Sequence, residues 1–73
     1  MNDPVLHPDH YTRGTIEVLD FITDQGLPYC AGNAVKYLCR YRWKNNPVED
    51  LRKARFYIER QMEIEQNGNA NKA

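Results

Sequence analysis

The chain has 73 residues, ten of them basic and ten acidic, which gives a formal net charge of zero at pH 7. A chain of this length forms one domain and buries only about 60% of the surface that its unfolded form exposes, so we expect a thin core. The sequence has no apolar run of about 18 residues and no basic-then-apolar leader, a pattern that predicts neither a membrane span nor a secretory signal. A cytoplasmic protein is therefore expected.

Small domains commonly compensate for a thin core with disulfides, metals or self-association. Cys30 and Cys39 are nine residues apart, about 13 Å of rise on one helix, which is too far for a disulfide between them. His7 and His10 have no second Cys or His pair at zinc spacing, so no protein-bound metal is predicted. Self-association remains, and we expect a homo-oligomer.

Charge is unevenly distributed along the chain. Residues 1–28 sum to −4, residues 29–60 to +5 and residues 61–73 to −1. Proteins that bind duplex DNA in general make several phosphate contacts over a basic surface, so a neutral chain with a cationic middle argues against that class. The pattern favours a small anion held at one place.

The first 14 residues contain Pro4, Pro8 and Gly14 and show no helical period, which predicts an irregular arm. Within it, His7, His10 and Tyr11 lie close together in the sequence. We interpret them as a ligand-lining loop in which a histidine contacts phosphate or base. The alternative is that these side chains cap a helix or pack over the thin core.

Helical periodicity begins at Thr15, a candidate N-cap, and ends near Gly26, which predicts a helix over residues 15–25. Glu17, Asp20 and Asp24 share its outer face. Acids in this arrangement can hold a magnesium ion through water molecules. The alternative is an ordinary solvated face.

The helix predicted over residues 29–44 has one polar, cationic and aromatic face, because the residues concerned lie three or four apart. They are Asn33, Lys36, Tyr37, Arg40 and Lys44. An amide can pair with a base edge, a tyrosine ring can stack on a base, and cations suit phosphate. The alternative is a solvated cationic face with Tyr37 partly buried.

Asn45, Asn46 and Pro47 break the helical pattern, and a last helix is predicted over residues 47–65, with a disordered tail over 67–73. Four residues form its expected buried stripe: Leu51, Ala54, Ile58 and Met62. On another face lie Asp50, Lys53, Tyr57 and Arg60. The spacing predicts ion pairs of Asp50 with Lys53 and of Glu59 with Arg55. The prediction is a small all-α domain of three helices, completed by oligomerisation.

Several motifs that define enzyme families are absent from the sequence: the P-loop, the GxGxxG fingerprint, the HExxH pair and the GxSxG elbow. Four other segments follow one another in a specific order: HPDHY at 7–11, TIEVLDFI at 15–22, LPYCAGNAVKYLCRY at 27–41 and EDLRKARFYIER at 49–60. In these segments the chain resembles the short phage-encoded SaV-like domain family, described as nucleotide kinases that lack a P-loop. The resemblance implies a phage protein that handles deoxynucleotides in the host cytoplasm.

The motif positions of that family that occur in this chain are His7, Pro8, His10, Tyr11, Gly14, Glu17, Gly32, Asn33, Lys36, Tyr37, Arg40, Asp50, Leu51, Lys53, Ala54, Tyr57 and Arg60. One departure follows Arg40, where many relatives have a small or glycine-containing segment. This chain has the bulky, charged segment Tyr41-Arg42-Trp43-Lys44, which bears on the choice of ligand.

The first functional hypothesis is a deoxynucleoside monophosphate kinase that uses ATP. Phosphoryl transfer depends on positioning and on neutralising negative charge, so we expect Arg40, Lys36 and His10 to be catalytic. The expected substrate-binding residues are His7, Tyr11, Asn33, Tyr37, Lys53, Tyr57 and Arg60. Magnesium would arrive with the nucleotide. The alternatives are a module that sequesters a nucleotide or signal, or engages a host protein, without turnover, and a purely structural role for the cations and aromatics.

Overall fold

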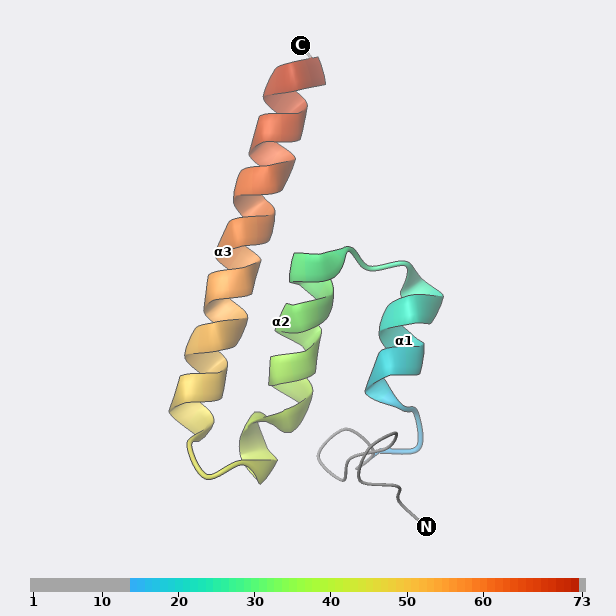
Figure 1. The fold of residues 1–73 in the computed structure, drawn as a ribbon, viewed down its shortest axis with the longest axis vertical. Helices are drawn as coiled ribbons and strands as arrows, with labels where there is room; N and C mark the ends of the chain where they lie inside the picture. The colour runs from blue at the N-terminus through green and yellow to red at the C-terminus, as the bar shows by residue number, and fades with distance from the viewer. Residues whose placement is uncertain (1–13, 73) are drawn as a thin grey trace.

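The protein is described by a computed structural model that covers the backbone of residues 14–72 and the side chains of residues 14–68. Its elements in chain order are α1 (Val18–Gln25), α2 (Tyr29–Arg40), the 3₁₀ turn η2 (Tyr41–Trp43) and α3 (Pro47–Lys72). The three helices run up, down and up, with α2 between α1 and α3 (Figure 1). Because the described residues form helices and no strand, the all-α prediction is confirmed.

Helix α1 begins later than the sequence predicts. Its N-cap is Glu17, which makes no side-chain capping hydrogen bond, and Thr15 lies outside the helix. The predicted cap at Thr15 is therefore wrong. The predicted end is correct: Gly26 adopts a left-handed conformation with φ 66°, and its N–H donates to the carbonyls of Ile22 and Thr23. Glycine suits this position because it has no Cβ to oppose a positive φ.

Helix α2 begins where predicted, but its last turn tightens into the 3₁₀ turn before Lys44. The start of α3 is capped by Asn46, whose Oδ1 accepts the Glu49 N–H at 3.1 Å while its Nδ2 donates to Glu49 Oε2 at 3.2 Å. Pro47 at the first helical position needs no hydrogen-bond partner for its nitrogen. The sequence Asn-Pro-x-Glu thus specifies a helix start directly after a short turn.

Helix α3 continues to Lys72, beyond the predicted end near residue 65 and into the segment 67–73 that was predicted to be a tail. No proline follows Pro47. The single glycine in this stretch, Gly68, costs a helix only about 1 kcal/mol relative to alanine. Nothing in the sequence therefore forces the helix to stop where its apolar period fades.

The core is as thin as expected. Ala34 and Ala54 are the buried apolar side chains of the described residues, at 4% and 2% exposure. Within one chain the predicted stripe on α3 is buried at Ala54, whereas Leu51, Ile58 and Met62 are 39%, 45% and 54% exposed. The reason is geometric: α2 covers one narrow side of α3, and α1 packs on α2. Within the described chain, no helix has the length of apolar sequence that crossing a bilayer requires.

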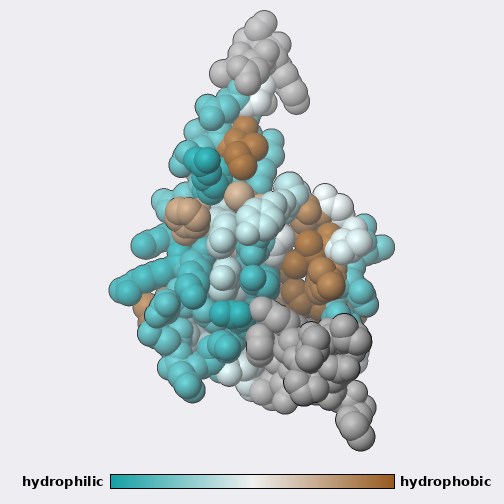
Figure 2. All heavy atoms as spheres, viewed as in Figure 1, coloured by the Kyte–Doolittle hydropathy of each residue, from teal (hydrophilic) through white to brown (hydrophobic). Residues whose placement is uncertain are grey.

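Close packing of α1 on α2 depends on Gly32. A Cβ at this position would lie 2.9 Å from Cγ2 of Ile22, which is closer than carbon atoms approach without displacement. Figure 2 shows apolar surface gathered between these two helices, whereas the surface over α3 is mostly hydrophilic. Gly32 therefore allows the contact by which α1 joins the α2–α3 pair.

Replacing Gly32 by valine is expected to lower the free energy of unfolding by about 2 kcal/mol, because overpacking a close contact typically costs about 1–3 kcal/mol. Thermal unfolding followed by circular dichroism measures the effect. Gly68 is the matched control, because a Cβ there meets nothing within 4 Å, and Gly68→Ala should leave the protein as stable or slightly more so. Equal stabilities for Gly32→Val and the unsubstituted protein would contradict this account of the α1–α2 contact.

Candidate functional site

Tyr37, on α2, is the centre of a group of cationic side chains. Lys36 Nζ lies 4.7 Å from the centroid of its ring and Arg40 Cζ lies 4.8 Å from it. From α3, Lys53 Nζ approaches to 5.5 Å. All three distances are in the range of cation–π attraction. The two helices therefore bring their cations to one tyrosine, as the faces predicted from the sequence require.

A row of aromatic rings extends from Tyr37. Its ring stacks on that of Tyr57 with centroids 5.9 Å apart and planes 11° apart. Tyr57 in turn meets Tyr29 edge to face at 6.2 Å and Phe56 at 5.2 Å. Tyr29 is 77% exposed, so its ring is accessible at the end of the row. We call six residues the tyrosine–cation cluster: Tyr29, Lys36, Tyr37, Arg40, Lys53 and Tyr57.

Arg40 is held by an acid from α3. Its Nε donates to Asp50 Oδ2 at 3.0 Å and its Nη2 donates to Oδ1 at 3.4 Å. The side chains are 16% and 6% exposed, so this forked ion pair is largely shielded from water. The predicted pair of Asp50 with Lys53 is wrong, because the turn between the helices places Asp50 beside Arg40. The fork that we expected to meet phosphate thus joins α2 to α3.

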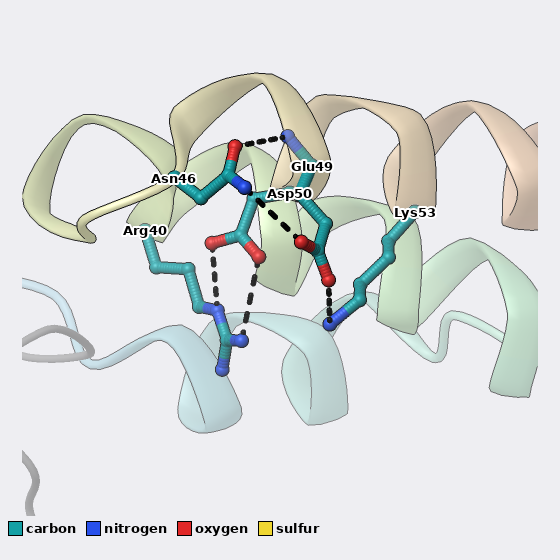
Figure 3. A network of polar contacts seen from close by, with 5 residues as sticks. All are labelled: Arg40, Asn46, Glu49, Asp50 and Lys53. Atoms are coloured by element: carbon teal, nitrogen blue, oxygen red, sulfur yellow. Dashed lines mark hydrogen bonds and ion pairs between the residues drawn. The ribbon is translucent and has the colours of Figure 1, made fainter.

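Lys53 has a different partner, Glu49, at 3.6 Å, and this pair is exposed. Figure 3 shows how Glu49 also contacts the capping residue Asn46, while Asp50 faces Arg40. These side chains surround a hollow of about 240 Å³ that opens beside the turn; its lining residues are Arg40, Lys44, Asn45, Asn46, Glu49, Asp50 and Lys53. Exposed pairs of this type contribute roughly 0–1 kcal/mol, so Glu49 holds the Lys53 ammonium group only weakly in place.

Two other residues predicted to bind substrate have partners within their own helices. Arg60 forms an exposed ion pair with Glu63 at 3.0 Å. Asn33 donates its Nδ2 hydrogen to the backbone carbonyl of Tyr29 at 2.9 Å. His7, His10 and Tyr11 lie outside the described residues, and their roles stay predictions.

The acidic face predicted for the first helix lies on α1 and begins at its N-terminal end. Asp20 lies in the first turn of the helix, after the N-cap Glu17. Across the described part of the chain, no three His, Cys, Asp or Glu side chains come together in a way that could hold a metal ion. Both cysteines are free, which agrees with the expectation that they do not pair.

Burial and the phenols of Tyr29 and Tyr37 raise the pKa of Tyr57 above its ordinary value of 10.0. Tyr57 is therefore a neutral phenol at physiological pH, able to donate a hydrogen bond. Partial burial also raises the pKa of Cys39. Its thiol is protonated at neutral pH, which makes it a weak nucleophile.

Sequence reasoning missed two features of the cluster. Tyr29 was not among the expected site residues, although it lies four before Asn33 on the same helix face. Asp50 was expected to pair locally, and only the contact between helices reveals its bond to Arg40. A helix-face analysis extended by one turn would have found Tyr29, whereas the partner of Asp50 depends on how α2 and α3 are aligned.

These observations define a small all-helical protein in which two antiparallel helices carry a cluster of tyrosines and cations. The model of the family described as a protein of unknown function (DUF3310) matches residues 5–59, which is most of the chain, and the chain belongs to this family. The matched range contains the whole cluster. No curated protein and no solved structure matches the chain.

Proposed function

We propose that the protein binds a nucleotide at the tyrosine–cation cluster and transfers a phosphoryl group from ATP to a deoxynucleoside monophosphate. The observation that carries the proposal is the convergence of Lys36, Arg40 and Lys53 on one tyrosine ring from two helices. A compact group of cations next to exposed aromatic surface suits a ligand with a phosphate at one end and a ring at the other.

Lys36 and Lys53 are the proposed phosphate ligands. Lys53 is 43% exposed and its pair with Glu49 is loose, so its ammonium group can turn towards an incoming anion. Arg40 contributes positive charge to the same place while Asp50 holds it in position. In phosphoryl transfer such charges stabilise the oxygens of the transferred group, and magnesium arrives with ATP and neutralises part of the remaining charge.

Tyr29 is the proposed platform for the base. Its ring is exposed and meets Tyr57 edge to face, so one of its faces can stack on a nucleobase. Stacking on an aromatic side chain is worth about 1–3 kcal/mol per base in proteins that bind single-stranded nucleic acids and depends little on which base is bound. The cluster therefore supports recognition of a nucleotide more strongly than selection of one base.

Binding without turnover is the second candidate. The observation that favours it is the forked bond of Arg40 to Asp50, because an arginine engaged in this way has less freedom to follow charge movement in a reaction. A phage protein of this kind would sequester a nucleotide or a nucleotide-derived signal and release it unchanged, or would engage a host protein through the same surface.

The test is incubation of the purified protein with each deoxynucleoside monophosphate, ATP and magnesium, followed by chromatography of all nucleotides and by thermal unfolding with each ligand. New deoxynucleoside diphosphate supports the kinase. A raised melting temperature with unchanged nucleotides supports sequestration, because a ligand that binds only the folded state stabilises it. If no deoxynucleoside diphosphate forms and no nucleotide at millimolar concentration raises the melting temperature, both the kinase and the nucleotide-sequestering module are contradicted.

A further inference from the structure

An apolar groove of about 510 Å³ lies between α2 and the second half of α3. Its lining residues are Ala31, Ala34, Val35, Leu38, Ile58, Gln61, Met62, Glu65 and Gln66. None of them belongs to the tyrosine–cation cluster. Leu38 and Ile58 are each 45% exposed and Met62 is 54% exposed. Contiguous exposed aliphatic side chains of this kind mark a surface that another molecule covers.

Helix α3 is longer than α2, the helix that packs against it. It has 26 residues against 12 in α2, and its final turns extend beyond α2 without a neighbouring helix among the described residues (Figure 1). A second helix along the groove would cover the apolar side of α3 that α2 leaves exposed.

The groove side of α3 carries a stripe of side chains that is complementary to the same stripe on a second copy of the helix. Leu51, Arg55, Ile58, Met62 and Glu65 recur at intervals of four and three residues. This is the spacing of a helix–helix seam. The middle of the stripe is apolar, its N-terminal part carries Arg55, and its C-terminal part carries Glu65, both exposed. Two copies of the stripe attract each other when they run in opposite directions.

We propose that this groove is the interface of a two-fold symmetric dimer in which the α3 helices of two copies run antiparallel. Centred between Ile58 and Met62, the arrangement places Ile58 of each copy opposite Met62 of the other, and Arg55 opposite Glu65. A two-fold interface uses the same patch on both subunits, as this one does. The two α2–α3 hairpins form a four-helix bundle, and the extension of each α3 lies beside the hairpin of the second copy.

Sedimentation equilibrium of the full chain measures the mass directly, and the expected value is that of two 8.6 kDa chains. Met62→Glu is expected to weaken dimerisation at least about 100-fold, because it buries two unpaired carboxylates at the seam. The exposed position of Met62 in the single chain predicts that helicity by circular dichroism is retained. The control is Phe56→Glu: Phe56 is 60% exposed but lies about 200° around the helix from Ile58, so this variant should remain dimeric.

Charge reversal tests the antiparallel direction. Arg55→Glu and Glu65→Arg should each be largely monomeric alone, since each places like charges opposite one another. Mixed in equal amounts they should form a heterodimer, in which each reversed charge meets an opposite one. A monomeric unsubstituted protein, a trimer or tetramer, a dimer that survives Met62→Glu, or two single variants that fail to associate on mixing would each overturn the proposal.

Discussion

Replacing Asp50 by alanine is expected to lower the free energy of unfolding by about 3–5 kcal/mol. The change leaves the Arg40 guanidinium, 16% exposed, without the carboxylate that neutralises it, and breaking one side of a largely buried ion pair typically costs this much. A domain of this length has a total stability of roughly 4–11 kcal/mol, so the variant should lose a large part of its stability. Urea unfolding followed by circular dichroism gives the value.

The adjacent acid provides the control. Glu49→Ala removes an exposed pair with Lys53 and one contact to the Asn46 cap, and its cost should not exceed about 1 kcal/mol. Combining Arg40→Met with Asp50→Leu should restore much of the stability that Asp50→Ala loses, because both charges are then removed together. If Asp50→Ala and Glu49→Ala were equally stable, the Arg40–Asp50 bond would have no structural role.

Replacing both Lys36 and Lys53 by glutamine is expected to weaken the binding of a deoxynucleoside monophosphate by about 100-fold or more. Each substitution removes a charged hydrogen bond to phosphate, which is worth about 1.5–3 kcal/mol. Glutamine keeps a polar side chain of similar length at each position. At a ligand concentration of 100 Kd, binding stabilises the unsubstituted protein by about 2.7 kcal/mol, whereas the variant at the same concentration gains about 0.4 kcal/mol. The melting-temperature shift should therefore nearly disappear.

Arg42→Gln combined with Arg52→Gln makes the same change in net charge at exposed positions outside the cluster. This variant should keep the full melting-temperature shift of the unsubstituted protein. If both double variants lost the shift equally, nucleotide binding would depend on overall charge and the cluster would not be its site. Unfolding of both variants without ligand separates loss of binding from loss of the fold.

Helix existence and helix faces could be predicted because they depend on local spacing. The Asn46-Pro47 start of α3 and the Gly26 end of α1 were both readable, since cap residues act within one turn. The exposure of Leu51, Ile58 and Met62 within one chain was not predicted, because a periodic stripe indicates which face is apolar but not how much of it a neighbouring helix of the same chain covers. The end of α3 was missed since no terminating residue marks it.

For the candidate site, too, the residues on each helix face could be predicted from the sequence, but the contacts between the helices could not. Lys36, Tyr37 and Lys53 were expected on two facing helices, and the structure brings them together. The stack of Tyr37 on Tyr57 and the bond of Arg40 to Asp50 depend on the alignment of one helix against the other. That alignment is a tertiary property, and no spacing within a single helix contains it.

The Arg40–Asp50 bond joins residues only ten apart in the chain, with the capped turn between them. A loop of this length closes in roughly 10–100 ns, and folds built from such local contacts form in microseconds to milliseconds. The α2–α3 hairpin can therefore assemble first as a nucleus, with α1, which has no buried residue, docking on it afterwards. Opening of α1 is then a local event, and the tyrosine–cation cluster, drawn entirely from α2 and α3, persists while it happens.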